Sequence, residues 1–113
     1  MALSKNNRLR RKRDFDAVFK EGRTAGGNFL FIKFRRSPSD QPRFSFVVSA
    51  RVVKRAVVRN MMRRHLSEAV RSRLPVQAGQ AYDVAVIITK LPPEGLPALR
   101  DDLLAVLRKA SIL

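Results

Sequence analysis

The sequence contains no cysteine and a single histidine, His65. These absences exclude disulfides, thiolate metal ligands, a cysteine nucleophile and a metal cage built from several histidines. No apolar run approaches the roughly 18 residues that a membrane-spanning helix needs. The N-terminus lacks the apolar centre of a signal peptide, although its arginine-rich start leaves a transit peptide open. We therefore expect a cytoplasmic protein that does not enter a membrane.

Acidic residues are scarce: 9 Asp and Glu stand against 24 Lys and Arg, for a net charge of +15. Like charges repel one another in a compact fold, so this excess indicates a polyanionic partner such as nucleic acid. The charge is also uneven. Residues 51–64 hold six basic side chains and no acidic one, whereas residues 82–113 hold four of each. The alternative is a solvated basic surface without a partner.

The chain has 113 residues, of which 45% are hydrophobic, enough for one domain with a modest core. We interpret residues 1–113 as a single domain that binds nucleic acid, in which residues 1–13 form a basic, partly ordered tail. A short helix is predicted from about Asp14 to just before Gly22. Its apolar face carries side chains three and four positions apart: Phe15, Val18 and Phe19.

Three segments rich in β-branched and aromatic residues predict strands, over 28–34, 43–49 and 82–89. Turn-forming residues at 37–42 predict that the first two strands form an antiparallel hairpin. A helix is predicted from Pro97, because leucines follow with helical spacing. With a further helix over 56–73, the order is α-β-β-α-β-α. This is an α+β sandwich, a small sheet with helices packed on it.

The helix predicted over 56–73 divides into two faces. At about 100° per residue, one side is mostly apolar and carries Val58, Met61, Met62, His65, Leu66 and Ala69. The other side is basic and polar and carries Arg59, Asn60, Arg63, Arg64, Ser67 and Arg71. We expect the apolar side to lie on the sheet and the arginines to bind phosphates. The preceding Arg51, Lys54 and Arg55 extend the basic surface.

Several other functions fit the sequence less well. A helix-turn-helix DNA-binding protein needs another helix just before the recognition helix, and here strands precede it. A membrane-surface helix needs a free apolar face, which the sheet requires here. For protein catalysis we find no nucleophile elbow and no glycine-rich phosphate loop. The acidic pairs Asp14/Asp16 and Asp101/Asp102 are expected to be charges at helix N-termini. Catalytic residues are therefore not predicted.

Two motifs resemble the bacterial ribonuclease P protein subunit family. The stretch RFSFVVSARVVKRAVVRNMMRRHLSEAVR (43–71) is similar to its signature of a strand, a basic loop and a helix with Arg-Asn-Arg followed by Lys-Arg. The stretch RLRRKRDFDAVFKEGR (8–23) is similar to its first element. The chain departs from the signature at Met61, where the family has arginine, and at Ser67, where it often has another.

The resemblance implies a small protein that assists a catalytic RNA in removing the 5′ leader of precursor tRNA, with one protein per RNA and no DNA partner. The RNA would supply the active site and bind Mg²⁺. The family fold also has a left-handed β-α-β crossover. By position, the RNA contacts would be Arg51, Lys54, Arg55, Arg59, Asn60, Arg63, Arg64 and Arg71. The groove for the leader would contain Phe15, Phe19, Leu30 and Ile32. A stand-alone RNA-binding protein of ribosomal or chaperone type remains the alternative.

Overall fold

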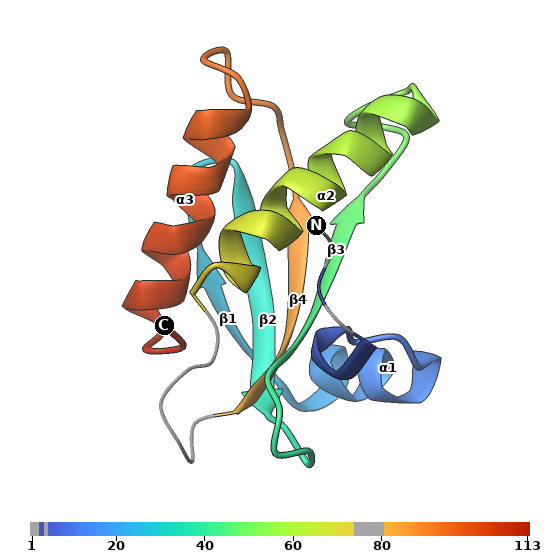
Figure 1. The fold of residues 1–113 in the computed structure, drawn as a ribbon, viewed down its shortest axis with the longest axis vertical. Helices are drawn as coiled ribbons and strands as arrows, with labels where there is room; N and C mark the ends of the chain where they lie inside the picture. The colour runs from blue at the N-terminus through green and yellow to red at the C-terminus, as the bar shows by residue number, and fades with distance from the viewer. Residues whose placement is uncertain (1–2, 4, 74–80) are drawn as a thin grey trace.

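The computed structural model describes residue 3, residues 5–73 and residues 81–113 (Figure 1). Their elements confirm the α+β class. The 3-10 turn η1 (Lys5–Asn7) and helix α1 (Lys12–Glu21) come first. Strands β1 (Arg23–Gly26), β2 (Leu30–Arg36) and β3 (Arg43–Val48) follow. Helix α2 (Ala56–Arg71), strand β4 (Tyr82–Ile88) and helix α3 (Leu96–Lys109) complete the order. The sequence predicted every helix and strand except β1.

The sheet has the strand order β1-β2-β4-β3. The hairpin predicted for segments 28–34 and 43–49 is therefore wrong, because β4 lies between the corresponding strands β2 and β3. β4 runs antiparallel to β2 and parallel to β3. It takes the centre because five of its seven residues are buried, as expected of a strand covered on both faces. The edge strand β1 is short, polar and mostly exposed, so it gave no apolar pattern to detect.

The connection from β3 through α2 to β4 is left-handed, as expected from the family resemblance. In Figure 1 both strands point upward, α2 crosses in front of them, and β4 lies to the left of β3. About 98% of such crossovers are right-handed. With α2 on this face of the sheet, a right-handed connection would place β4 on the outer side of β3, where it could not pair with β2. The unusual hand therefore follows from the strand order together with the face that α2 covers.

Helices α2 and α3 cover one face of the sheet, and the main core lies between these helices and the sheet (Figure 1). Alternate residues of the three long strands point into this core: Leu30, Ile32, Phe34, Phe44, Phe46, Val48, Val84, Val86 and Ile88. From α2, Met62 and Leu66 are buried as predicted. Met61 is not: its side chain is 48% exposed, so its assignment to the inner face is wrong.

Asp102 ties α3 to the turn between β1 and β2. Its carboxylate accepts hydrogen bonds from the backbone N–H groups of Asn28 (2.9 Å) and Phe29 (2.8 Å). The residue is buried in the middle of α3, so its assignment as a helix N-terminal charge is wrong. Gly27 permits this close approach, because a Cβ there would lie 2.6 Å from the Asp102 carboxylate.

The opposite face of the sheet carries α1 and a smaller core of Leu9, Val18 and Ala85. The chain before α1, predicted to be a partly ordered tail, also packs on the protein. The Leu9 N–H donates to the Phe44 carbonyl at 2.9 Å, and the Asn7 side chain donates to the Pro42 carbonyl at 2.8 Å. Residues 1, 2 and 4 of the predicted tail lie outside the described residues. The basic N-terminal segment is thereby fixed beside β3.

Candidate nucleic-acid interface

Most polar side chains on the outer face of α2 lie away from the main core, as predicted, but Ser67 is buried, so its assignment to the outward side is wrong. Asn60, Arg64 and Arg71 are exposed, while Arg59 and Arg63 are half-buried. Before the helix, the extended backbone of Arg55 begins the first turn, and all three predicted basic residues of this loop, Arg51, Lys54 and Arg55, are exposed. The core-facing Met62 and Leu66 hold this array of donors at a fixed orientation.

The α2 arginines differ in what holds them. Arg59 Nη1 donates to the carbonyls of Val53 (2.9 Å) and Lys54 (2.8 Å), so this arginine anchors the preceding basic loop to the helix. Arg63 donates to the Asn60 side-chain oxygen at 2.7 Å, and Arg71 pairs with Glu68 at 2.8 Å. Within the described residues, Arg64 makes no hydrogen bond or ion pair. Its guanidinium is the most available to an external phosphate.

A hollow of about 350 Å³ separates α2 from the N-terminal segment. Its lining comes from the N-terminal segment, from β3 and from α2: Leu3, Arg8, Leu9, Arg10, Phe44, Ser45, Phe46, Asn60, Arg63, Arg64 and Ser67. The four arginines come from two segments that lie about fifty positions apart in the sequence, and the edge strand β3 lies between them. Arg8 and Arg10 are not among the predicted site residues, because the sequence predicts a partly ordered tail for their segment.

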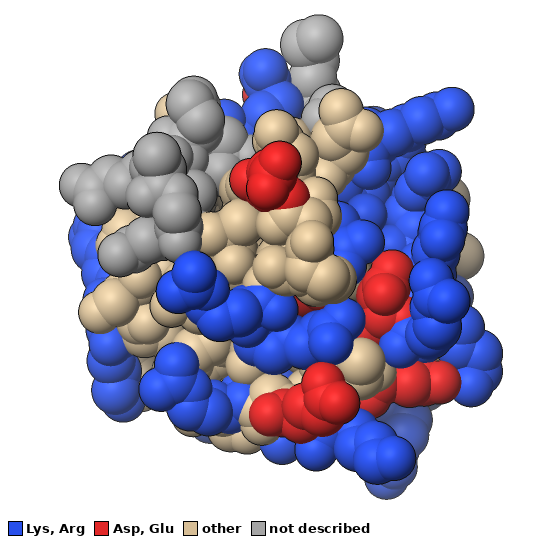
Figure 2. Space-filling view, turned by 90° about the horizontal axis from the view of Figure 1, so that it is seen from below, with Lys and Arg blue, Asp and Glu red and all other residues tan. Residues whose placement is uncertain are grey.

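A second hollow, of about 420 Å³, lies on the other side of the N-terminal segment. It is lined by Lys5, Asn6, Arg8, Arg10, Arg11, Arg13, Asp14, Pro38, Ser39, Gln41 and Arg43. Arg8 and Arg10 line both hollows, so these two arginines lie between them. We call the cations of these hollows and of α2 the basic track. Figure 2 shows Lys and Arg crowded along the side of the molecule where α1 lies, with acidic groups interspersed among them.

On the α1 side of the sheet, aromatic side chains stand at the edge of the small core. The rings of Phe15 and Phe19 are 4.8 Å apart, and Phe19 is 38% exposed. The expectation for Leu30 and Ile32 is wrong, since their exposed fractions are 2% and 0% and they face α2 and α3. Their strand neighbour Phe31 points to the α1 side instead.

Phe31 belongs to a row that crosses all four strands. It pairs with Gly26 of β1 and with Ile87 of β4, and Ile87 pairs in turn with Val47 of β3. The three apolar side chains of this row are half-buried. Ile87 also contacts the small core that Phe15 joins. Together, Phe15, Phe19, Phe31, Val47 and Ile87 form a partly open apolar surface, which we call the α1-side surface.

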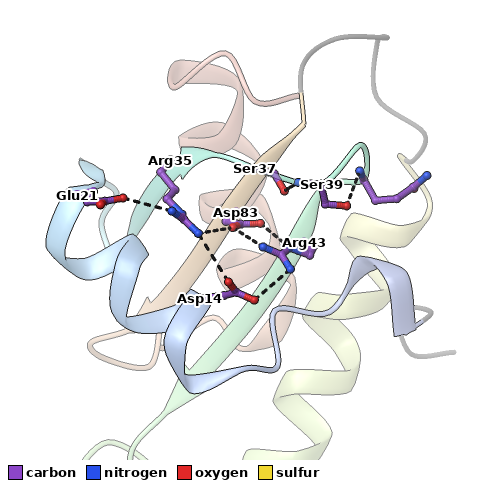
Figure 3. A network of polar contacts seen from close by, with 8 residues as sticks. Asp14, Glu21, Arg35, Ser37, Ser39, Arg43 and Asp83 are labelled. Carbon is purple, nitrogen blue, oxygen red and sulfur yellow. Dashed lines mark hydrogen bonds and ion pairs between the residues drawn. The ribbon is translucent and has the colours of Figure 1, made fainter.

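Two rows further along the same face, the side chains are ionic (Figure 3). Arg43 binds the fully buried Asp83 through two hydrogen bonds of 2.7 Å, and Arg35 lies 3.4 Å from the same carboxylate. Asp14 of α1 pairs with Arg43 at 3.2 Å. The hydrogen bonds to Asp83 raise the pKa of Arg43, which keeps the guanidinium charged. This network fixes the start of α1 on the sheet beside the basic track.

Potential catalytic and metal-binding groups are sparse. In the described part of the chain, no three side chains among His, Cys, Asp and Glu lie close enough together to hold a metal ion. His65 lies half-buried on α2, and its Nε2 atom is buried without a hydrogen-bond partner. Over the same described residues, no helix is long and apolar enough to cross a membrane.

Comparison with known proteins shows the family. A family model described as Ribonuclease P matches residues 3–111. The chain belongs to the ribonuclease P protein family. A ribonuclease P protein component from Pseudanabaena is 34% identical over 112 residues, covering 98% of this chain and 97% of that protein. Another, from Chloroflexus aurantiacus, is 41% identical over 111 residues, covering 94% of this chain and 78% of its own length.

Solved structures agree with this assignment. The ribonuclease P protein of Staphylococcus aureus superposes with a TM-score of 0.82 at 21% identity, covering 93% of this chain and 95% of that one. The protein of Thermotoga maritima gives a TM-score of 0.73 at 26% identity, covering 91% and 96%. Membership of the family implies association with ribonuclease P RNA and a role in tRNA processing.

Proposed function

We propose that this chain is the accessory protein of a ribonuclease P holoenzyme and binds two RNAs at once. The basic track would hold the catalytic RNA. The α1-side surface would hold the single-stranded 5′ leader of precursor tRNA. The observation that carries the proposal is the position of Arg8 and Arg10, which border both hollows and so lie between the α2 arginines and the cations before α1.

The proposed contact with the catalytic RNA is mainly electrostatic. Arginine binds phosphate through two parallel hydrogen bonds, and the α2 helix presents its arginines from a rigid support. A protein that contacts six to ten phosphates loses about 10³–10⁵ in affinity between 50 and 200 mM salt. The net charge of +15 predicts a dependence of this size. Sites for this contact are Arg51, Lys54, Arg55, Arg59, Asn60, Arg63, Arg64 and Arg71, with Arg8 and Arg10 added from the structure.

The proposed contact with the leader uses stacking. Unpaired bases stack on aromatic rings for about 1–3 kcal/mol each. Phe19 offers an exposed ring, and the half-buried Phe31 lies on the same side of the sheet. A leader that crosses this surface would approach the cations near Asp14, where its phosphates could be neutralised. The chain would thereby prefer precursor tRNA to mature tRNA, which has no leader.

Hydrolysis is assigned to the RNA partner with Mg²⁺. The acidic side chains nearest the track do not fit a magnesium site, because Asp14 and Asp83 are neutralised by Arg43. Magnesium prefers carboxylate, phosphate and water oxygens, which a folded RNA supplies in abundance. The protein's part is to hold the substrate and to screen phosphate repulsion between the two RNAs. We further propose one protein per RNA, no DNA partner, and a location in the cytoplasm.

Reconstituted cleavage tests the proposal. The purified protein is mixed with a bacterial ribonuclease P RNA and 5′-labelled precursor tRNA at a Mg²⁺ concentration at which the RNA alone is slow. We expect faster release of the leader and a lower KM for precursor. A protein that binds the RNA but leaves its cleavage rate unchanged would instead be a stand-alone RNA-binding protein. Tighter binding to duplex DNA than to structured RNA at the same salt would favour a DNA-binding protein.

A further inference from the structure

Exposed apolar side chains gather at one place on α2 that the basic track does not explain. Among the described residues, four large hydrophobic side chains are exposed: Phe19, Val57, Met61 and Leu91. Phe19 belongs to the α1-side surface. The other three lie at the first turns of α2 and in the loop that leads to α3, with exposed fractions of 74%, 48% and 46%. Val57 and Met61 are one turn apart, so they share a stripe of the helix.

Met61 and Leu91 line a hollow of about 200 Å³. Its lining is almost wholly apolar and comprises Val58, Met61, Met62, Leu91, Pro92, Gly95 and Leu96. Gly95 has no side chain that could fill the hollow from its side. It adopts a φ of 95°, which disfavours any side chain, and its N–H closes the turn by donating to the Pro92 carbonyl at 3.1 Å. Water in such a hollow finds few hydrogen-bond partners, so an apolar ligand face would readily displace it.

No charged residue lines this hollow, but charged residues lie within a few positions of its lining residues in the sequence, and they indicate the class of ligand. Lys54 and Arg55 are exposed just before the helix, and Arg64 is exposed one turn beyond Met61. Against them stands one exposed carboxylate, Glu94, in the loop. An apolar protein segment would leave these cations without counter-charges near the contact. A nucleotide combines a flat, weakly hydrated face with a phosphate, so it satisfies both features.

We propose that this hollow receives an unpaired nucleobase of the RNA bound along α2. The inference rests on the proposed RNA-binding function and adds a base-binding site to it. One face of the base lies against Met61 and Leu91, and its hydrogen-bonding edge stays in water at the open side. The phosphate that follows reaches Arg64 or the Lys54–Arg55 pair. Apolar side chains hold extruded bases in this manner, and the thioether of methionine adapts to the ring.

Methyl NMR of methionine tests this directly. Protein with ¹³C-labelled methionine methyl groups is titrated with short oligoadenylate, and with a strand of equal length that has the sugar-phosphate backbone but no bases. The Met61 signal is assigned by its loss in Met61→Leu. We expect the oligoadenylate to shift the Met61 signal through the ring current of a base. The base-free strand should bind the basic surface and leave that signal in place.

The possible outcomes separate the site from the proposed function. If both strands bind and the Met61 signal moves equally with each or with neither, the base-binding site is wrong although RNA binding stands. If neither strand binds, the RNA-binding function fails and the site fails with it. A Met61 signal that moves only with rising protein concentration would assign the hollow to a second copy of the chain, and would also overturn the site.

Affinity gives a second readout. Met61→Ala combined with Leu91→Ala should weaken oligoadenylate binding about fivefold, near the lower end of single-base stacking. Binding of the base-free strand should not change. Met61→Leu keeps an apolar wall and should retain most of the affinity. Because both side chains are about half exposed, urea unfolding should show that the double variant remains folded. An equal loss for both strands would overturn the inference.

Discussion

The two faces of the sheet are built for different purposes. The face under α2 and α3 is a closed core in which alternate residues of every long strand are buried. The face under α1 has a much smaller core, a partly open apolar row and a buried ion network. A closed apolar face supplies stability, while the half-covered face keeps side chains accessible to a ligand. The same four strands therefore serve as scaffold on one side and as candidate binding surface on the other.

The largest effect should come from removing the charge at the centre of the ion network. Asp83→Asn leaves Arg43 and Arg35 without their buried carboxylate, and losing one partner of a buried pair costs about 3–5 kcal/mol. Urea unfolding measures this loss. The control Asp101→Asn changes the net charge equally at an exposed position and should cost under about 0.5 kcal/mol. Equal losses would mean that net charge, and not the network, sets stability.

The next comparison sets two neighbours on β2 against each other. Leu30→Ala should destabilise the fold by about 2–5 kcal/mol, because it opens a cavity in the main core. Phe31→Ala should cost less stability but should weaken precursor tRNA binding by about 1–3 kcal/mol relative to mature tRNA. Measuring both affinities and the urea midpoint separates the two roles. A selective loss of precursor binding in Leu30→Ala would reverse the assignment of the two faces.

These neighbours also show where prediction from sequence ends. The segment 28–34 was recognised as a strand because it is apolar on both sides. That same property hid which side faces the main core, and the leader groove was consequently assigned to Leu30 and Ile32. The face is decided by register: β4 pairs with β2 so that Val84, Val86 and Ile88 join the same core as those two residues. Pairings between strands distant in sequence cannot be read from local patterns.

The α2 face was predictable because helical periodicity is local. Arg64 and Leu66 lie on the sides that their spacing indicates. Arg8 and Arg10 could not be identified in the same way, since their position depends on the hydrogen bond between the Leu9 N–H and the Phe44 carbonyl, which joins distant segments. A signal was available in Leu3 and Leu9, apolar residues within a basic stretch, and both are buried.

The close packing of the α3 side can be tested at two adjacent glycines. A Cβ on Gly27 would lie 2.6 Å from the Asp102 carboxylate and 2.7 Å from Val106, whereas one on Gly26 would meet nothing within 4 Å. Gly27→Ala should therefore cost about 1–3 kcal/mol by overpacking. Gly26→Ala should be neutral or slightly stabilising, because alanine loses less backbone entropy in a strand. Thermal unfolding of both variants measures the difference. Equal melting temperatures would show that the turn can move away from α3 at no cost in stability.

The smallest expected effects distinguish two arginines of one helix. Arg64 makes no hydrogen bond or ion pair with the described residues, so Arg64→Gln should leave stability unchanged and lower the slope of log affinity against log salt by about one. Arg59 holds two loop carbonyls, so Arg59→Gln should cost about 1 kcal/mol in unfolding free energy. Salt-dependent RNA binding and urea unfolding, measured on both variants, provide the test. Arg100→Gln on α3, with the same charge change, serves as control for the slope. If Arg64→Gln changes the slope no more than Arg100→Gln, the track does not reach this part of α2, because a phosphate contact at Arg64 must release a counterion.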